Sequence, residues 1–222
     1  MPMYLFLKRS LDIFISLSAL VLLLPFLVPI VIVLRLTGEG YVFYRQRRIG
    51  LHNVYFDILK FATMLKDSPN MGTGSITLRQ DPRITPMGTF LRKTKINELP
   101  QILNVLKGDM SIVGPRPLVD KTFNAYPEAI RDKVYQSRPG ITGIGSIIFR
   151  DEESLISASP LEPHAFYAQI IAPYKGALEM WYLTHKSMGV DLKIIFLTAW
   201  AILFSKNELV YRWFKDLPPR SF

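Results

Sequence analysis

The residues best suited to chemistry lie together in residues 95–117, which read KINELPQILNVLKGDMSIVGPRP. Asn97 and Glu98 are adjacent and precede Pro100, where a helix is expected to break or begin, so both side chains can point into one cleft. A carboxylate there can hold Mg²⁺, because proteins bind this ion through carboxylates together with substrate phosphates. Spacing alone, however, favours the simpler interpretation that Glu98 caps or solvates the start of a helix.

Basic side chains on either side of this pair suit a phosphorylated ligand. Arg116 stands between Pro115 and Pro117, whose rings fix the backbone and limit the entropy lost when a guanidinium binds phosphate. A rigid turn with an exposed arginine explains the same three residues equally well. Arg92 precedes Glu98 by six positions, so only a break or a curved turn can bring both side chains to one site.

The composition narrows the chemistry further. The chain has 222 residues, with 27 Lys and Arg against 18 Asp and Glu, and the net charge of +9 suits an anionic partner. Nucleic acid is not expected, because the basic residues are spread along the chain and no known nucleic-acid motif occurs. The absence of cysteine excludes disulfides and thiolate chemistry. Mechanism must therefore come from carboxylates, amides, Arg, Lys and backbone groups.

An uncharged apolar stretch from Ile13 to Leu34 precedes all of these residues and is long enough to cross a bilayer as a helix. It is too long for a secretory signal and lacks a small-residue cleavage site. Pro25 and Pro29 favour a kink in its middle. Basic residues flank both ends: Lys8, Arg9, Arg35, Arg45, Arg47 and Arg48. A re-entrant helix that returns to the same face satisfies the positive-inside tendency, and a kinked transmembrane anchor remains open.

The remaining elements predict a mostly helical α+β fold. We expect a strand over 40–50, a segment over 54–65 that begins as a strand and turns helical, helices over 89–108 with a break at Pro100, a helix over 126–138 and a glycine-containing link over 140–149. The apolar stretch from Asp191 to Phe204 is too short to span a membrane and suits a helix in the headgroup region, or a buried core helix. Two units are expected, a membrane segment over 1–35 and a cytoplasmic-face catalytic domain with interfacial helices over 36–222.

These motifs resemble a known family, the bacterial sugar transferases that are monotopic phosphoglycosyl transferases. The resemblance covers nearly the whole chain. The motifs that carry it are KRSLD, YRQRRIG, LKFATM, the central block from RQDPRITPMG to GPRP, RPGITG and DLKIIFLTAW. The central block is long and specific, so a chance match is not credible.

The resemblance implies an activity and a location. Members of this family transfer a sugar-1-phosphate from a UDP-sugar to polyprenyl (undecaprenyl) phosphate, giving a polyprenyl-diphosphate-sugar and UMP. This is the first membrane step of surface-glycan synthesis, such as O-antigen, capsule or exopolysaccharide. The resemblance further implies Mg²⁺ as cofactor, a re-entrant helix hairpin, contact with membrane lipids and an active site on the cytoplasmic face of the inner membrane. A homodimer remains an open expectation, and the sugar is not specified.

The resemblance also assigns roles to particular residues. Glu98 corresponds to the glutamate of the family's Asp–Glu pair before Leu-Pro-Gln, and it would hold Mg²⁺. Arg92 and Lys60 match basic positions that contact phosphate, and Asp191 matches an acidic position near the site. The turn Pro115-Arg116-Pro117 matches a motif on the nucleotide side.

The chain departs from the family pattern at the position of the nucleophile, where Asn97 replaces the aspartate. An amide is not a competent nucleophile toward a phosphoester. Either polyprenyl phosphate attacks directly, or Glu98 is the nucleophile, or the chain is an engineered inactive form or a catalytically impaired scaffold that binds without turnover. The neutral amide also predicts weaker metal affinity. A second departure, over Arg150 to Phe166, indicates a distinct subgroup with its own sugar preference and favours a natural variant.

Overall fold

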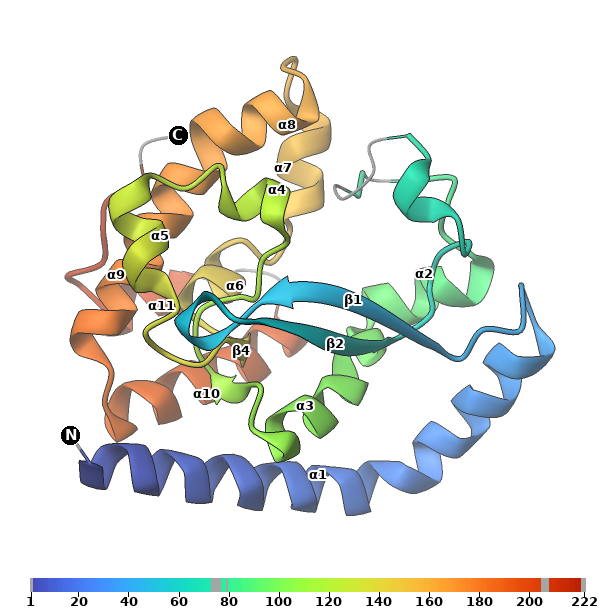
Figure 1. Cartoon of the computed structure of the whole chain (residues 1–222), viewed down its shortest axis with the longest axis horizontal. Coiled ribbons are helices and arrows are strands. Elements are labelled where there is room, and N and C mark those ends of the chain that lie inside the picture. Colours follow the sequence, from blue (N-terminus) through green and yellow to red (C-terminus); the bar gives the residue numbers. More distant parts are fainter. Residues whose placement is uncertain (1, 73–76, 79, 205–207, 221–222) are drawn as a thin grey trace.

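The computed structural model describes residues 2–72, 77–78, 80–204 and 208–220. The chain forms a mostly helical α+β body above one long N-terminal helix, α1 (Pro2–Leu36), which confirms the expected fold class (Figure 1). The other α-helices are α2 (Pro86–Lys93), α3 (Ile102–Lys107), α4 (Asp120–Phe123), α5 (Glu128–Val134), α6 (Ile144–Ile148), α7 (Glu152–Ala158), α8 (Pro163–Phe166), α9 (Ala172–His185), α10 (Met188–Leu203) and α11 (Glu208–Trp213). The strands are β1 (Phe43–Ile49), β2 (Tyr55–Phe61), β3 (Ser111–Val113) and β4 (Gly140–Thr142). Short turns of other helix types are η1 (Leu51–Asn53), η2 (Ser68–Asn70), η3 (Ile96–Gln101) and η4 (Tyr167–Ile171).

Helix α1 is long and apolar enough to cross a membrane by length and composition. It runs along the base of the body and bends in its second half, where Pro25 and Pro29 lie (Figure 1). The polar side chains near its start bond to α3 and β3, whereas Leu27, Ile30, Val31 and Leu34 near its end pack around Phe61 and Leu91. Both ends of the helix therefore contact the same body, and most of its apolar surface between them stays exposed.

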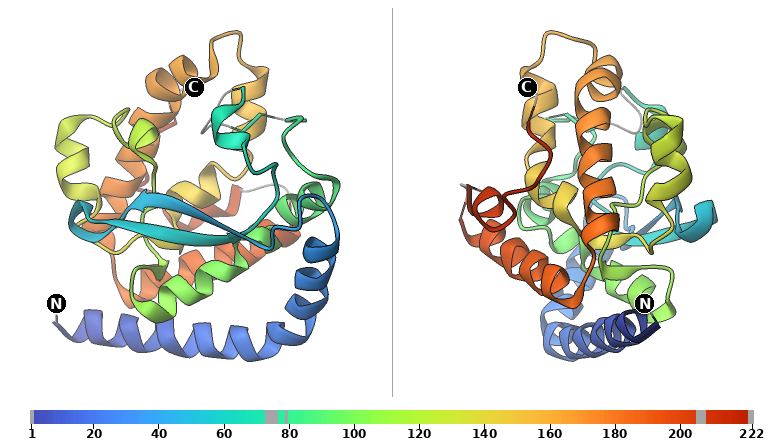
Figure 2. Two further views of the ribbon diagram at one scale, coloured as in Figure 1. Left: turned by 45° about the vertical axis from the view of Figure 1, so that its right-hand side comes forward. Right: turned by 90° about the vertical axis from the view of Figure 1, so that its left-hand side faces the viewer.

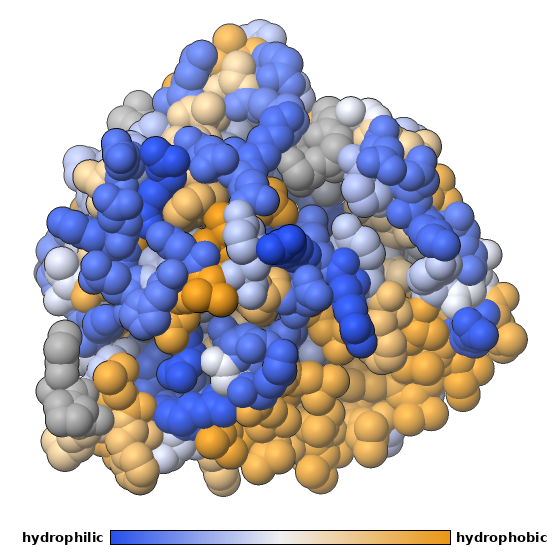
Figure 3. Space-filling view, viewed as in Figure 1, coloured by the Kyte–Doolittle hydropathy of each residue, from blue (hydrophilic) through white to orange (hydrophobic). Residues whose placement is uncertain are grey.

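This exposed surface forms a continuous apolar band. Its large side chains include Phe6, Phe14, Val21, Leu22 and Phe26, all of which are about 70% exposed. The space-filling view shows the band along the lower edge of the molecule, below a mostly hydrophilic upper surface (Figure 3). An uncovered surface of this kind indicates contact with lipid or with another protein.

Strands β1 and β2 form an antiparallel hairpin whose register runs from Phe43 opposite Phe61 to Ile49 opposite Tyr55. The strand expected over 40–50 is confirmed as β1, Phe43–Ile49. The expectation that residues 54–65 turn helical is wrong, because pairing with β1 keeps β2 extended to Phe61 and Met64 then forms a bridge with Ile84. The Met64–Ile84 bridge brings the chain that follows η2 back beside the residues after β2.

Strands β3 and β4 pair in parallel, Ser111 with Gly140 and Val113 with Thr142. Residues 140–149, expected as a link, therefore form β4 and α6. The break expected at Pro100 is confirmed, since η3 is a 3₁₀ helix and α3 begins at Ile102. The helix expected over 126–138 is shorter and corresponds to α5.

The main core surrounds α9, which packs against α5 and α6. Figure 2 shows α9 upright through the body and α10 crossing below it, on the side of α1. Helix α10 buries Ile194, Leu197 and Ala201 in this core but leaves Phe196 and Leu203 exposed. Helix α10 therefore carries apolar residues both in the core and at the surface, and it contacts β3 and β4.

Candidate functional site

One carboxylate, that of Glu98, lies between two cations. Its Oε1 is 3.2 Å from Lys60 Nζ and 3.2 Å from Arg116 Nη2. Glu98 comes from η3, Lys60 from β2 and Arg116 from the turn after β3. Three segments far apart in sequence thus meet at one point. The structure brings together three of the residues expected at the site.

The side chain of Asn104, in α3, fixes η3 and α3 against strand β2. Its Oδ1 accepts a hydrogen bond from Leu59 N at 3.0 Å, and its Nδ2 donates to Asp57 O at 2.8 Å. Both bonded residues lie just before Lys60 on the same strand. They hold the strand that carries Lys60 at a set distance from the helical segment that carries Glu98.

The electrostatic balance keeps Glu98 ionised. Burial favours the neutral carboxyl, but Lys60, then Arg116 and Lys95, outweigh it and hold the pKa of Glu98 well below its usual range. Burial also lowers the pKa of Lys60 to about 8, against the opposing effect of Glu98 and with Arg116 and Arg48 adding to it. The Lys60 side chain is 15% exposed and that of Glu98 17%, so both groups remain within reach of a ligand.

The turn that carries Arg116 is fixed by bonds to its backbone. Tyr135 Oη donates to Arg116 O at 2.8 Å, and Arg48 Nη1 donates to Pro117 O at 3.0 Å. Gly140 N donates to Pro115 O at 2.8 Å, which ties the turn to the start of β4. Pro115 and Pro117 therefore hold the backbone of a turn whose arginine points to Glu98, rather than a loop with a free arginine.

Arg48 was not anticipated as a site residue. Burial and the nearby Arg116 lower its pKa to about 10. With Lys60, Arg116 and Pro117 it lines a small hollow of about 10 Å³, enough for roughly one water molecule. The alternation in YRQRRIG places Arg48 and Gln46 on one face of β1, and Gln46 accepts from the Arg48 guanidinium. This alternation was the feature of the sequence that could have identified Arg48 as a site residue.

Asn97 is buried, 7% exposed, and its Oδ1 has no hydrogen-bond partner within the described part of the chain. Buried polar atoms are normally hydrogen-bonded, so an orphaned acceptor marks a place where a donor or a cation fits. Asn97 Oδ1 and the Glu98 carboxylate are oxygen ligands of the type that Mg²⁺ takes. The described residues contain no group of three or more His, Asp or Glu that could hold a metal ion, so an ion at this place would need further ligands from outside the chain. The two oxygen ligands present are of a kind that fits a magnesium ion.

Arg92 lies at the edge of this group, where its guanidinium pairs with Glu153 of α7 and not with Glu98. Lys95 is close to both ion pairs. Burial lowers its pKa first, and the charges of Glu98, Arg116, Glu153 and Arg92 also act on it. Arg92 therefore lies near the site, but its charge is already balanced by Glu153. The partner Glu153 belongs to the segment 150–166, where a departure from the family pattern is expected from the sequence.

Asp191 lies elsewhere. Its carboxylate accepts from Lys8 Nζ at 2.8 Å, from Tyr182 Oη at 2.8 Å and from Tyr4 Oη at 3.0 Å, and it is 1% exposed. No hydrogen bond joins it to Glu98, Lys60 or Arg116 among the described residues. The structure therefore places Asp191 at the junction of α1, α9 and α10, not beside the central carboxylate.

A second buried acid, Glu179 of α9, was not anticipated. Burial raises its pKa to about 7, with Lys175 and Arg116 acting in the opposite direction. Lys175 in turn forms an ion pair with Glu152 of α7. The four-residue spacing of Lys175 and Glu179 on one helix face was the only signal in the sequence. These groups extend the charged region from Arg116 toward α7.

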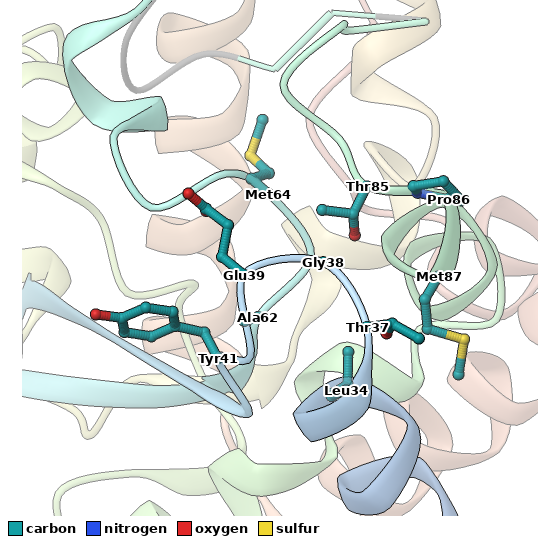
Figure 4. A pocket seen from close by; sticks show the side chains of 10 residues that line it. All are labelled: Leu34, Thr37, Gly38, Glu39, Tyr41, Ala62, Met64, Thr85, Pro86 and Met87. Carbon is teal, nitrogen blue, oxygen red and sulfur yellow. The ribbon is translucent and has the colours of Figure 1, made fainter.

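A larger cavity lies apart from these residues, at the end of α1. It has a volume of about 230 Å³, and most of its lining side chains, such as Leu34, Met64 and Met87, are apolar (Figure 4). Its carboxylate, Glu39, accepts from the backbone N–H of Lys66. None of the expected site residues lines this cavity, and it offers no pair of groups for catalysis.

The site is thus a fixed carboxylate among several cations, in a body that contacts a long exposed apolar helix. The chain belongs to the bacterial sugar transferase family, whose pattern matches residues 3–205. The exopolysaccharide production protein ExoY of Sinorhizobium fredii is 32% identical over 215 residues, which cover 90% of this chain and 87% of the relative.

Two longer relatives are also similar. The undecaprenyl-phosphate glucose phosphotransferase of Komagataeibacter xylinus is 35% identical over 205 residues, covering 90% of this chain and 36% of the relative. The UDP-N-acetylgalactosamine-undecaprenyl-phosphate N-acetylgalactosaminephosphotransferase of Aeromonas hydrophila is 32% identical over 204 residues, covering 91% of this chain and 45% of the relative. The chain thus spans most of the short relative and less than half of these two.

Proposed function

We propose that this protein transfers a sugar-1-phosphate from a UDP-sugar to undecaprenyl phosphate and releases UMP, as the first membrane step of surface-glycan synthesis. The observation that carries the proposal is Glu98 held between Lys60 and Arg116, in a chain whose relatives are named for sugar-phosphate transfer to undecaprenyl phosphate. The identity of the sugar is open, because the names of the relatives include glucose, galactose and N-acetylgalactosamine.

The cations of the site would neutralise the charge of the donor diphosphate. Arg116 suits bidentate contact with phosphate oxygens, and protonated Lys60, which contacts the same Glu98 oxygen, supplies a point charge. Phosphoryl transfer depends mainly on positioning and electrostatic stabilisation. When Mg²⁺ is bound, held by Glu98 and Asn97, it adds Lewis-acid stabilisation of the diphosphate.

The nucleophile in this proposal is the acceptor itself. An oxygen of undecaprenyl phosphate attacks the β-phosphorus of the donor, the bond from this phosphorus to the bridging oxygen breaks, and UMP leaves with the electron pair. Glu98 is a poor nucleophile here, because two ion pairs stabilise its charge and its pKa lies well below the usual range. The Asn97 amide cannot take the part of a carboxylate nucleophile, which leaves direct attack as the chemistry that these residues support.

Contact with the membrane follows from α1. We propose that its exposed apolar band enters the bilayer and that both ends return to the cytoplasmic face of the bacterial inner membrane, because both ends contact one body. The exposed apolar residues of α10, with Trp200 and Trp213 nearby, would lie at the interface. The lipid phosphate would then reach the site at membrane level.

The test of this function is UMP release from a panel of UDP-sugars with undecaprenyl phosphate and Mg²⁺. We expect turnover by the natural chain and a loss of about 10²–10³-fold in Glu98→Gln, the range seen when one electrostatic contact of a transition state is removed. Glu128→Gln is the matched control, since Glu128 is exposed in the first turn of α5. Unchanged UMP release in Glu98→Gln would refute the role of this carboxylate.

A second candidate follows from Asn97 alone. A member that binds both substrates at the membrane without turnover would act as a scaffold for glycan assembly. In that case the chain binds UDP but releases no UMP with any donor, whereas Asn97→Asp turns over.

A further inference from the structure

Charged residues near the start of α1 turn inward instead of facing solvent. Lys8 is 8% exposed and Asp12 4%, although both precede the apolar stretch of a helix that is otherwise largely exposed. Burying charged side chains is costly unless they are paired and hydrogen-bonded, so their partners show what the burial achieves. Those partners lie on both sides of the candidate site.

Asp12 and Lys8 hold strand β3. Asp12 Oδ1 accepts from Ile112 N at 2.9 Å and from Ser111 Oγ at 3.1 Å. Lys8 Nζ donates to Val113 O at 2.9 Å. Successive residues of β3 are therefore bonded to one helix, and the next residues along the chain form the turn that carries Arg116.

Arg9 holds the end of α3. Its Nη1 donates to Val105 O at 2.6 Å and its Nη2 to Leu106 O at 2.8 Å. These carbonyls belong to the last turn of α3, where the helix itself offers no further N–H groups, and Val105 O also accepts from the capping residue Gly108 at 3.0 Å. Helix α3 follows directly after η3, the segment that carries Asn97 and Glu98.

Asp191 closes the arrangement. It pairs with Lys8 and also accepts from Tyr182 of α9 and Tyr4 of α1. Removal of one partner from such a buried pair leaves an uncompensated charge, which is costly. Helix α1 is therefore favoured in the one position on the body where Lys8 reaches Asp191. The helix can thus hold β3 and α3 at a constant separation.

We propose that Lys8, Arg9 and Asp12 are positioning residues, here called the α1 brace, that set the distance between Glu98 and Arg116. The brace couples the seating of the membrane helix to the geometry of the site, so that the site is complete only when α1 lies against β3 and α3. The effect of the α1 brace on catalysis rests on the proposed function. The fixing of β3 and α3 by the brace does not, and the experiment tests the two statements separately.

The experiment compares Asp12→Ala, Asp12→Asn and Arg9→Lys in the full chain in nanodiscs, with Arg35→Gln as control. Arg35 lies at the other end of α1 and makes one exposed hydrogen bond, to Gly40 O. The first measurement is amide hydrogen exchange in residues 111–117 by mass spectrometry, which needs no activity. We expect exchange faster by about tenfold or more in Asp12→Ala, because an N–H loses its acceptor.

The conservative variants separate the brace from general destabilisation. Asp12→Asn keeps an acceptor oxygen and should restore slow exchange, and Arg35→Gln should match the natural chain. Arg9→Lys cannot donate to both carbonyls in the same geometry, so exchange over 102–107 should rise while the chain stays folded. Unchanged exchange in both Asp12→Ala and Arg9→Lys overturns the brace, whether or not the protein releases UMP.

The second measurement is a double-mutant cycle on kcat/KM for UMP release, with Asp12→Ala, Arg116→Lys and both together. If Asp12 acts through Arg116, Asp12→Ala lowers kcat/KM much less in the Arg116→Lys background than in the natural chain, so the two effects do not add. Additive losses mean that Asp12 only stabilises the fold and overturns the positioning role. Absence of UMP release in the natural chain counts against the proposed function and leaves the exchange result to decide the brace.

Discussion

At the scale of single residues, the site depends on how Glu98, Lys60 and Arg116 share charge. The carboxylate is held ionised by its neighbours, and in return it keeps Lys60 protonated to a higher pH than burial alone would allow. The pKa of Lys60 nevertheless falls to about 8. The charge of the site is therefore constant in mildly acidic and neutral solution and decreases above that.

This gives a prediction on pH. UMP release should fall by about tenfold for each pH unit above 8, as Lys60 loses its proton. Lys60→Arg should flatten this limb, because a guanidinium stays charged, whereas Lys107→Arg at an exposed position should not change it. The free energy of unfolding changes in the opposite direction. Between pH 8 and 10.5 the unfolded chain binds more protons than the folded one, so the cost of burying Lys60 falls and the free energy of unfolding rises with pH. A pH profile with no basic limb near 8 in the natural chain would contradict the role of Lys60.

Which residues meet at the site was only partly predictable. Glu98 and Arg116 stand out in sequence because each is next to a proline-fixed break, a local signal. Lys60 and Asp191 were assigned to the site by resemblance alone, whereas Arg92 was also considered because it precedes Glu98 by six positions. Arg48 and Glu179 were missed, because their roles depend on strand pairing and on packing of α9, which no local pattern reveals. Asp191 belongs to the α1 brace region through contacts made 183 residues away in sequence.

At the scale of elements, the parallel pair β3–β4 sets the turn that carries Arg116. Residues 54–65 and 140–149 were predicted poorly because strand pairing overrides local preference: β2 stays extended by pairing with β1, and residues 140–142 become β4 by pairing with the distant β3. The helix break at Pro100 and the strand ending near Gly50 were predicted well, because proline, glycine and alternation act locally.

Gly140 provides the prediction at this scale. A Cβ on this residue would lie 2.1 Å from Gly114 N, so β3 and β4 could no longer approach. Gly140→Ala should lower the free energy of unfolding by about 2–3 kcal/mol, as expected of overpacking against backbone, and should weaken UDP binding. Gly189→Ala is the control, because a Cβ there meets nothing within 4 Å and alanine favours a helix. Thermal unfolding in detergent distinguishes the two, and equal stability of both variants would contradict this account of the pair.

At the scale of the whole molecule, a long apolar helix underlies a hydrophilic body that contacts both of its ends. The length and composition of α1 were readable from sequence, and so was a bend at its prolines. Its contacts with β3 and α3 were not, since they depend on where the body folds back.

The path of α1 through the membrane can be tested with single cysteines, because the chain has none of its own. Met3 and Leu36, near opposite ends of α1, are 75% and 79% exposed. In Met3→Cys and Leu36→Cys, a membrane-impermeant maleimide should label both positions from the cytoplasmic side of inverted vesicles. A helix that spans the bilayer leaves one of the two unlabelled, and that result would contradict the re-entrant path.

The central claim is that a site with Asn97 in place of a carboxylate still transfers sugar phosphate, by direct attack of the lipid phosphate. The most direct measurement is UMP release by the natural chain and by Asn97→Asp, each with and without undecaprenyl phosphate. We predict that the natural chain releases UMP only when the acceptor is present and that no covalent sugar-phosphate adduct appears by intact mass. A natural chain that is silent with every donor, beside an active Asn97→Asp, would contradict the account and identify the protein as a binding-only member of its family.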